Sequence, residues 1–471
     1  MNPARLILPA LRAASDDSFA HESGAIQSAL ELGVGGFILF GGNVGSVRAL
    51  TADLVRRAGR ALLIGSDLER GAGQQVAGLP ELPPPGALGW LDDPEVVRWA
   101  GGVTAAAARS VGINWVFAPV ADLDALPSNP IVQTRAFGAD PDRVAECVRG
   151  WVEGCEEAGA LACAKHYPGH GRTTVDSHVS LPSVTASEAA LAAEDERPFA
   201  AAVAAGVASI MTAHVAFPAL DPGGGPATLS PPILERLRRR LGFDGVVVTD
   251  ALVMEGALSG RQQTEAAVEA LRAGVDLLLY PKDPAAVSAA LAQAVGSGEI
   301  ATERLAEAYR RYEVALARAA RPPVALPSGP YQTTEELADA LLDRGLVRGS
   351  ARRLTRPIEL IVADDDVGGP YPPSPADYLG GRLAERSLLG AGGSRIMLAF
   401  AEPRAWKGRA GFGAEAGAVL AREAPRADLV VLFAHPRLAA EIPGSAPVLL
   451  AWHRQRLMQE AAARWIAART A

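Results

Sequence analysis

The segment AKHYPGHGRTTVDSHVSLP, residues 164–182, contains three of the seven histidines of the chain, with one lysine and one aspartate. Glycine and proline interrupt it, so we expect a loop. Asp176 and His178 are two residues apart, and in such a loop the carboxylate can bond one imidazole nitrogen and fix the tautomer. This pairing raises the basicity of the ring, which can then deliver a proton to a leaving group. The segment therefore indicates proton transfer.

A metal site and a phosphate-binding loop are two other candidates for the same segment. His166 and His170 are four residues apart, but the proline and glycine between them exclude the helix of an HExxH zinc site. A metal site built by the loop from His170, Asp176 and His178 stays open, because such ligands need no regular spacing. The stretch PGHGRTT lacks the lysine and the following helix of a phosphate-binding P-loop.

Asp250 is the second candidate for chemistry. It ends the run GVVVTD and precedes the helix-prone ALVMEGAL, so we expect it at a helix N-terminus, where a carboxylate stays ionised. An ionised carboxylate in that place can act as a nucleophile toward an electrophilic carbon. The alternative role is that of a helix N-cap.

Short apolar runs alternate with segments of helical period, which is typical of βα units and a parallel sheet. We expect eight strands, at residues 5–9, 35–41, 61–67, 114–120, 160–166, 207–214, 245–250 and 275–280. This number and order favour a (β/α)8 TIM barrel, in which the carboxyl ends of the strands open onto one face. The ionisable residues at these ends are Asp67, Asp122, Lys165, His166, His214 and Asp250.

A proline-rich stretch, RPPVALPSGPYQ at 321–332, predicts a linker after the barrel. Four further strand-like runs follow it and predict a smaller C-terminal α/β domain, in which we recognise no functional motif. The expected boundaries are 1–322 for the barrel, 323–356 for the linker with a helical connection, and 357–471 for the C-terminal domain.

The bulk properties exclude several classes of partner. The net charge of −8, with acidic and basic residues interspersed, is opposite to that of a nucleic-acid-binding surface. No apolar run approaches the roughly 20 residues of a membrane-spanning helix, and the N-terminal segment lacks the apolar region of a secretion signal. We expect a cytoplasmic protein without cofactor or resident metal, whose three cysteines are reduced. Its oligomeric state is not predicted.

These motifs together resemble the β-N-acetylhexosaminidase branch of glycoside hydrolase family 3. The resemblance covers roughly residues 5–320 and rests on motifs in the order of the family. They are GINWVFAPVADLDALPSNPIVQTRAFGADP, KHYPGHGRTTVDSH, IMTAHVAFPALD and GVVVTDALVMEGA. The PGHG and DSH elements are typical of the hexosaminidase branch rather than the glucosidase branch.

The resemblance implies a retaining hydrolase that releases terminal β-linked N-acetylglucosamine (GlcNAc) from small soluble glycosides. Asp250 would be the nucleophile and would form a covalent glycosyl-enzyme. His178, held by Asp176, would be the general acid and then the general base. Most retaining glycosidases use a pair of carboxylates instead.

The resemblance also implies which residues bind the sugar, whose hydroxyl groups need paired donors and acceptors. These residues are Asp67, Arg135, Lys165 and His166, with His170 in the mobile loop. Family members often carry a DxEGGRV-like stretch, whereas this chain has DLERGAGQQV at 67–76 without the expected arginine. No contact is therefore assigned to residues 68–76.

Three alternative functions remain. Inorganic phosphate could replace water as the acceptor of the sugar, because a histidine, unlike a carboxylate, does not repel an incoming anion. A non-catalytic sugar-binding protein is a second alternative, although a binder has no reason to keep both a nucleophile and an acid. A metal-dependent hydrolase is the third.

Overall fold

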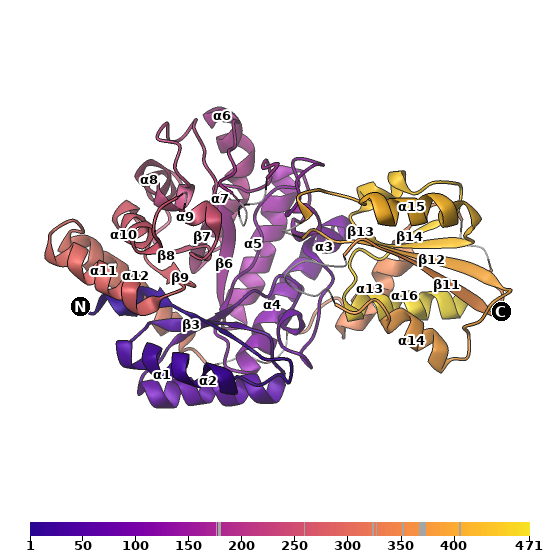
Figure 1. Ribbon diagram of the computed structural model, residues 1–471, viewed down its shortest axis with the longest axis horizontal. Coiled ribbons are helices and arrows are strands. Elements are labelled where there is room, and N and C mark those ends of the chain that lie inside the picture. The colour runs from indigo at the N-terminus through magenta and orange to yellow at the C-terminus, as the bar shows by residue number, and fades with distance from the viewer. Residues whose placement is uncertain are drawn as a thin grey trace. The chain divides into compact units, whose positions relative to one another are not determined.

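The computed structural model describes residues 1–175, 177, 180–258, 260–322, 325, 327–350, 353–366, 374–404 and 407–471. Two compact units make up the chain (Figure 1). The first comprises Met1–Glu81, Asp93–Leu126 and Ala136–Pro330. The second comprises Leu82–Asp92, Pro127–Arg135 and Tyr331–Ala471, so it includes two segments from the first third of the chain.

The first unit contains a curled parallel sheet with the strand order β2-β3-β4-β5-β6-β7-β8. A parallel pair, β1 with β9, and a bridge between Val248 and Leu277 continue the pairing beyond β8. All seven residues of β6 are buried, as expected for a parallel strand covered on both faces. The strands are β1 (Ile7–Leu8), β2 (Ala10–Arg12), β3 (Gly36–Phe40), β4 (Leu63–Ser66), β5 (Trp115–Val116), β6 (Leu161–Tyr167), β7 (Ser209–Thr212), β8 (Val246–Thr249) and β9 (Leu278–Leu279).

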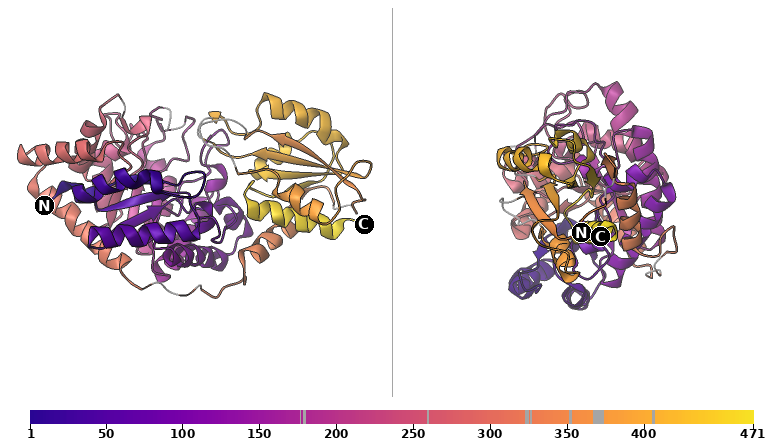
Figure 2. Two further views of the ribbon diagram at one scale, coloured as in Figure 1. Left: turned by 60° about the horizontal axis from the view of Figure 1, so that its bottom comes forward. Right: turned by 90° about the vertical axis from the view of Figure 1, so that its right-hand side faces the viewer.

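Helices cover the outside of this sheet (Figures 1 and 2). They present apolar stripes of helical period to the strands, as α5 does with Val144, Val148, Trp151 and Cys155, all buried. The helices are α1 (Ser23–Leu32), α2 (Val44–Ala58), α4 (Pro94–Ser110), α5 (Pro141–Glu157), α6 (Glu188–Ala190), α7 (Arg197–Ala204), α8 (Pro231–Arg239), α9 (Glu255–Leu258), α10 (Gln263–Ala273), α11 (Pro284–Gly296) and α12 (Thr302–Ala319).

Helices α4 and α5 pack against each other with little space between their backbones. A Cβ atom at Gly154 would lie 1.9 Å from the carbonyl oxygen of Arg98, so only glycine fits there. The three cysteines are free thiols, as predicted, and the two buried ones are Cys155 in α5 and Cys163 in β6. Burial raises the pKa of Cys163 to about 12.

The first predicted strand differs from the structure. Residues 3–6 form a 3-10 helix, η1 (Pro3–Leu6), and the strand expected at 5–9 is divided into β1 and β2. Pro9 lies between the two strands. Because proline has no N–H to donate to a neighbouring strand, it interrupts the strand at this point. The other seven strands fall within the predicted ranges or extend one residue beyond them.

The second unit has a five-stranded sheet in the order β10-β14-β13-β12-β11, in which only β10 is antiparallel to its neighbour. Helix α15 lies on one face, and α13, α14 and α16 lie on the other (Figures 1 and 2). The elements are β10 (Leu346–Arg348), β11 (Ile358–Asp364), β12 (Ser394–Ala401), β13 (Leu429–Ala434), β14 (Val448–Leu450), α3 (Pro85–Leu91), α13 (Thr334–Arg344), α14 (Tyr378–Glu385), α15 (Ala414–Glu423) and α16 (Arg456–Arg469).

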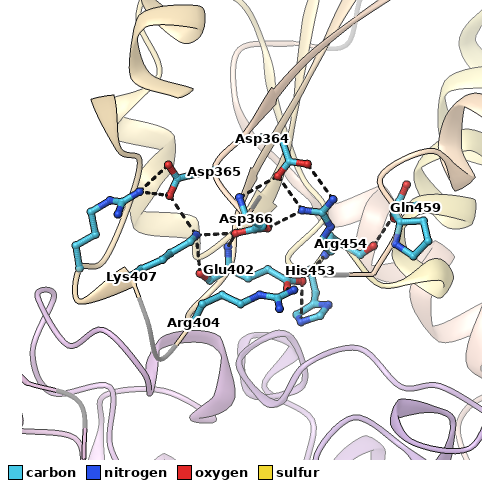
Figure 3. Close-up of polar contacts among 11 residues, drawn as sticks. Asp364, Asp365, Asp366, Glu402, Arg404, Lys407, His453, Arg454 and Gln459 are labelled. Atoms are coloured by element: carbon cyan, nitrogen blue, oxygen red, sulfur yellow. Dashed lines mark hydrogen bonds and ion pairs between the residues drawn. The ribbon is translucent and has the colours of Figure 1, made fainter. Parts of the chain in front are cut away.

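A network of charged side chains lies at the carboxyl ends of β11, β12 and β14 (Figure 3). Lys407 Nζ lies 2.6 Å from Asp366 Oδ1, and Arg454 Nη1 lies 3.1 Å from Asp366 Oδ2. His453 Nε2 lies 2.8 Å from Glu402 Oε1. Burial, together with the charge of Glu402, raises the pKa of Asp366. Each buried charge in this network is paired with an opposite charge, which offsets the free-energy cost of removing it from water.

Among the described helices, none combines the length and apolarity needed to cross a lipid bilayer.

Candidate active site

The structure places most of the predicted site residues at one end of the sheet in the first unit. Asp67 directly follows β4, and Asp250 directly follows β8. Lys165 and His166 are the fifth and sixth residues of β6, whose register against β7 shifts between Ala164 and Tyr167. The carboxyl ends of parallel strands meet at one edge, which is why residues far apart in the sequence come together.

Three predicted residues are not among those that the structure places at this end of the sheet. Asp176 and His178 are outside the described residues, so the structure does not test the proposed acid/base pair. Arg135 belongs to the second unit, where it ends the 3-10 helix η4 (Gln133–Arg135) and its Nη1 donates to the carbonyl of Ile131 at 3.3 Å.

Lys165 is surrounded by two carboxylates. Its Nζ lies 2.7 Å from Asp67 Oδ1 and 2.7 Å from Glu69 Oε1. The lysine and Glu69 side chains are buried, at 3% and 7% exposure, whereas Asp67 is 29% exposed. The ammonium group therefore holds Asp67 in place while part of this carboxylate stays open to a ligand.

Asp122 is a buried carboxylate that organises the neighbouring residues. Its Oδ2 lies 2.7 Å from His166 Nδ1, and its Oδ1 accepts the backbone N–H groups of His166, at 3.1 Å, and His170, at 2.6 Å. Burial alone would raise the pKa of Asp122, but the charges and hydrogen bonds of the two histidines outweigh burial and lower it. An ionised carboxylate can only accept, so Nδ1 of His166 carries a proton.

The other ring nitrogen of His166 faces Asp250. The Nε2 atom lies 3.9 Å from Asp250 Oδ2, and the Asp250 side chain is 21% exposed. Asp250 Oδ1 accepts the N–H of Ala251 at 2.7 Å. Asp250 is thus the more exposed end of a chain of groups that begins at the fully buried Asp122.

The prediction that a helix begins directly after Asp250 is wrong. Among the described residues 250–258, the only helix is α9, which has four residues and begins at Glu255. A turn intervenes, in which Met254 N donates to Ala251 O and Leu252 N donates to Leu279 O. Asp250 is therefore not an N-cap, and a local backbone N–H rather than a helix dipole contacts its carboxylate.

His214 is fully buried and contacts the backbone of the residue that follows Asp250. Its Nε2 lies 3.2 Å from the carbonyl oxygen of Ala251, and its Nδ1 lies 2.8 Å from Thr228 Oγ1. Because a carbonyl only accepts, Nε2 carries the proton and the tautomer is fixed. Burial lowers the pKa of His214, against the opposing effect of the nearby Asp250 charge. A neutral imidazole thus supports the backbone next to Asp250.

His170 links the loop after β6 to the same group. Besides its N–H bond to Asp122, its Nδ1 lies 2.8 Å from Thr173 Oγ1 and its Nε2 lies 3.0 Å from Ser177 Oγ. The His170 side chain is therefore hydrogen-bonded on both nitrogens within the loop. No group of three or more His, Cys, Asp or Glu side chains in the described chain is placed to hold a metal ion.

Sequence reasoning gave no role to three residues that contact the predicted site. Asp122 and His214 were recognised only as polar residues at strand ends, and that position was the signal that could have assigned them. Glu69 lies in the divergent segment 67–76, where its type and position carried no separate signal.

Comparison with known proteins shows the family to which the chain belongs. Residues 18–314 match the model of the glycosyl hydrolase family 3 N-terminal domain. A beta-hexosaminidase of Thiobacillus denitrificans is 38% identical over 271 residues, which are 55% of this chain and 75% of that protein. A solved family 3 beta-N-acetylglucosaminidase from Paenibacillus sp. str. FPU-7 has a TM-score of 0.84 and 28% identity, covering 100% of this chain and 96% of that one.

A further solved structure is similar in fold. The beta-glucoside phosphorylase BglX superposes with a TM-score of 0.82 at 21% identity, covering 100% of this chain and 91% of that one.

The α/β fold, the ionisable residues at the strand ends and these matches define the protein as a glycoside hydrolase. The chain belongs to glycoside hydrolase family 3, and its resemblance is to the β-N-acetylhexosaminidase branch of that family. Its substrate is accordingly a small-molecule glycoside.

Proposed function

We propose that the protein is a retaining exo-β-N-acetylglucosaminidase. The observation that carries this proposal is the Asp250 carboxylate, partly exposed at the end of β8 and 3.9 Å from His166 Nε2. A carboxylate fixed by a backbone N–H beside a cluster of hydrogen-bonding side chains suits nucleophilic attack on a sugar that these side chains hold.

The reaction has two steps. In the first, an Asp250 oxygen forms a bond to the anomeric carbon, the bond from this carbon to the leaving oxygen breaks, and His178 gives a proton to that oxygen. In the second, His178 takes a proton from water, whose oxygen replaces Asp250 at the anomeric carbon. Two inversions give net retention. Asp176 would fix the tautomer of His178.

The sugar-binding residues remain those that the resemblance implies. Asp67, held by Lys165, would accept a sugar hydroxyl, because its carboxylate is the exposed member of that group. His166 and His170 would contribute from the strand β6 and its loop, and Arg135 from its own segment. Paired donors and acceptors of this kind suit a polyhydroxylated ring.

The architecture is part of the same proposal. The pairing of β1 with β9 and the Val248–Leu277 bridge support closure of the curled sheet into a (β/α)8 barrel. The proposed divisions remain 1–322, 323–356 and 357–471.

A phosphorylase is the second candidate. The fold likeness to a beta-glucoside phosphorylase and the use of a histidine as the base both suit phosphate as the acceptor in the second step. In that case the product is the sugar 1-phosphate, and activity rises with phosphate concentration.

The test compares p-nitrophenyl β-N-acetylglucosaminide with the β-glucoside, with and without inorganic phosphate. We expect selective turnover of the acetamido sugar, with a loss of about 10³-fold or more in kcat for Asp250→Ala. Azide added to Asp250→Ala should yield the α-glycosyl azide, because it enters from the face that the carboxylate has vacated.

Asp142→Ala is the control, since Asp142 lies at the surface of α5 with 64% side-chain exposure. Undiminished turnover by Asp250→Ala would contradict the nucleophile. A faster release of GlcNAc-1-phosphate than of GlcNAc would establish the phosphorylase instead. If a strong chelator abolished activity, a metal-dependent reaction would replace both, and binding of GlcNAc without turnover would indicate a sugar-binding protein.

A further inference from the structure

Ser177 stands between Asp176 and His178 in the sequence and is itself buried, at 1% exposure. Its side chain and its backbone are both hydrogen-bonded to described residues. The hydroxyl Oγ lies 3.0 Å from His170 Nε2, and the carbonyl oxygen accepts the N–H of Gly256 at 3.0 Å. A small polar residue at this point of the loop is thus bonded in two directions.

The bond to Gly256 connects the loop after β6 with the segment that follows Asp250. Gly256 is the second residue of α9. The turn before α9 is in turn held by bonds from Met254 N to Ala251 O and from Leu252 N to Leu279 O. The carbonyl of Ser177 is therefore bonded to a segment that the turn after Asp250 and a hydrogen bond to β9 hold in place.

Only glycine fits at position 256. A Cβ atom there would lie 2.7 Å from the Ser177 carbonyl oxygen, closer than such contacts occur, and 3.1 Å from the His214 carbonyl oxygen, closer than most of them. The two backbones meet without an intervening side chain, and any larger residue would separate them.

The bond to His170 connects Ser177 with the buried end of the site. His170 N donates to Asp122 Oδ1, and Asp122 Oδ2 lies 2.7 Å from His166 Nδ1. Ser177 is therefore linked on one side to the group around His166 and on the other to the segment after Asp250.

We propose that Ser177 is a positioning residue, which sets the place of the proposed acid/base residue relative to the nucleophile. This inference rests on the proposed function. Ser177 is adjacent in the sequence to both residues of the proposed acid/base pair, so its two hydrogen bonds anchor the loop segment that carries them. Proton delivery requires hydrogen-bond reach, and small displacements of the donor cost much of its effect.

The test uses Ser177→Ala, which removes the hydroxyl, and Gly256→Ala, which separates the backbones. Each variant is assayed with two substrates of different leaving group: p-nitrophenyl β-N-acetylglucosaminide, whose leaving group needs little protonation, and the β1,4-linked disaccharide of GlcNAc, whose leaving group needs a proton. We expect kcat/KM for the disaccharide to fall about 10²-fold, the effect of a general acid, and that for the nitrophenyl substrate to fall less than about 10-fold.

A second measurement separates positioning from general damage. Azide needs no general base, so it should raise kcat of both variants on the nitrophenyl substrate and yield the β-glycosyl azide. The native enzyme should gain nothing. Gly225→Ala is the matched control, because nothing lies within 4 Å of a Cβ atom there.

Equal losses on both substrates without azide rescue, or no loss at all, would overturn the inference. His178→Ala in the same assays keeps the two hypotheses apart. If His178→Ala shows the leaving-group dependence and Ser177→Ala does not, only the positioning role fails. If His178→Ala itself lacks the dependence, the proposed acid/base assignment fails. Thermal unfolding of each variant checks that losses in activity occur in folded protein.

Discussion

The imidazole Nε2 of His166 lies 3.9 Å from Oδ2 of Asp250, at the distance of an ion pair. The opposite ring nitrogen is bonded to Asp122, which is fully buried. The ring therefore stands between two carboxylates in different surroundings. Asp122 determines the orientation and tautomer of the ring, and Asp250 is the carboxylate that a substrate can reach.

Asp122→Asn should lower kcat/KM for p-nitrophenyl β-N-acetylglucosaminide by about 10²-fold. The amide lacks the negative charge and can turn its NH2 group toward His166, which would then favour the other tautomer. Loss of an orienting carboxylate of this type costs between 10-fold and 10⁴-fold in other sites. Kinetic assays on the purified variant measure the effect, and full activity would show that the orientation of His166 does not matter. Asp142→Asn, on the surface of α5, is the control.

Lys165→Met should destabilise the fold by about 3–5 kcal/mol, because it leaves two carboxylates close together without their cation. Glu69 is buried and both oxygens involved lie 2.7 Å from Nζ. Urea unfolding at neutral pH measures the change. Glu69→Gln, which keeps the shape and one charge pair, should cost less than the lysine substitution. The reverse order would contradict the ion-pair explanation.

The stability of the first unit should fall in mild acid. Burial lowers the pKa of His214 below its ordinary 6.5. A group with a depressed folded pKa contributes stability above the unfolded value and loses it as the pH falls, because the unfolded state binds the proton first. The pKa of Asp122 also lies below its ordinary 3.8, so Asp122 too loses its contribution to stability as the pH falls, at a lower pH than His214.

Replacement of His214 tests this pH dependence. Between pH 6.5 and 5, the free energy of unfolding of His214→Gln should depend less steeply on pH than that of the native chain, by up to about 1.4 kcal/mol per pH unit. Urea titrations at several pH values give the slopes. His21→Gln, at an exposed histidine with 52% side-chain exposure, should leave the slope unchanged. Identical slopes for the native chain and His214→Gln would argue against a neutral His214.

In the second unit, Lys407→Met should destabilise the sheet by about 3–5 kcal/mol, because Lys407 is buried between Asp365 and Asp366. Arg409→Gln, whose side chain is 43% exposed and also pairs with Asp365, should cost about 1 kcal/mol or less. Calorimetric unfolding of both variants compares them. An equal loss of stability in both variants would show that burial does not determine how much these ion pairs stabilise the fold.

Local patterns in the sequence were enough to predict most of the strands, although the first one is divided and β10, within the predicted linker and helical connection at 323–356, was not predicted. Runs such as GGFILFG and GVVVTD are apolar, β-branched and bounded by turn residues, so β3 and β8 appear where they were expected. The helix expected after Asp250 does not form there, because bonds to Leu279 and Ala251 hold that segment in a turn. The bond from Leu252 to Leu279 joins this segment to β9, and no local propensity reports such a contact.

The sequence by itself therefore determined the α/β class, the strand order, the membership of an enzyme family and the set of ionisable residues at the strand ends. Tertiary structure alone decided which residues touch: Lys165 with Asp67 and Glu69, Asp122 with His166, and Ser177 with Gly256. The physical reason is that hydrogen bonds and ion pairs act over about 3 Å. Strand period places a residue at an edge, but the curl of the sheet and the paths of the loops bring two side chains within that distance.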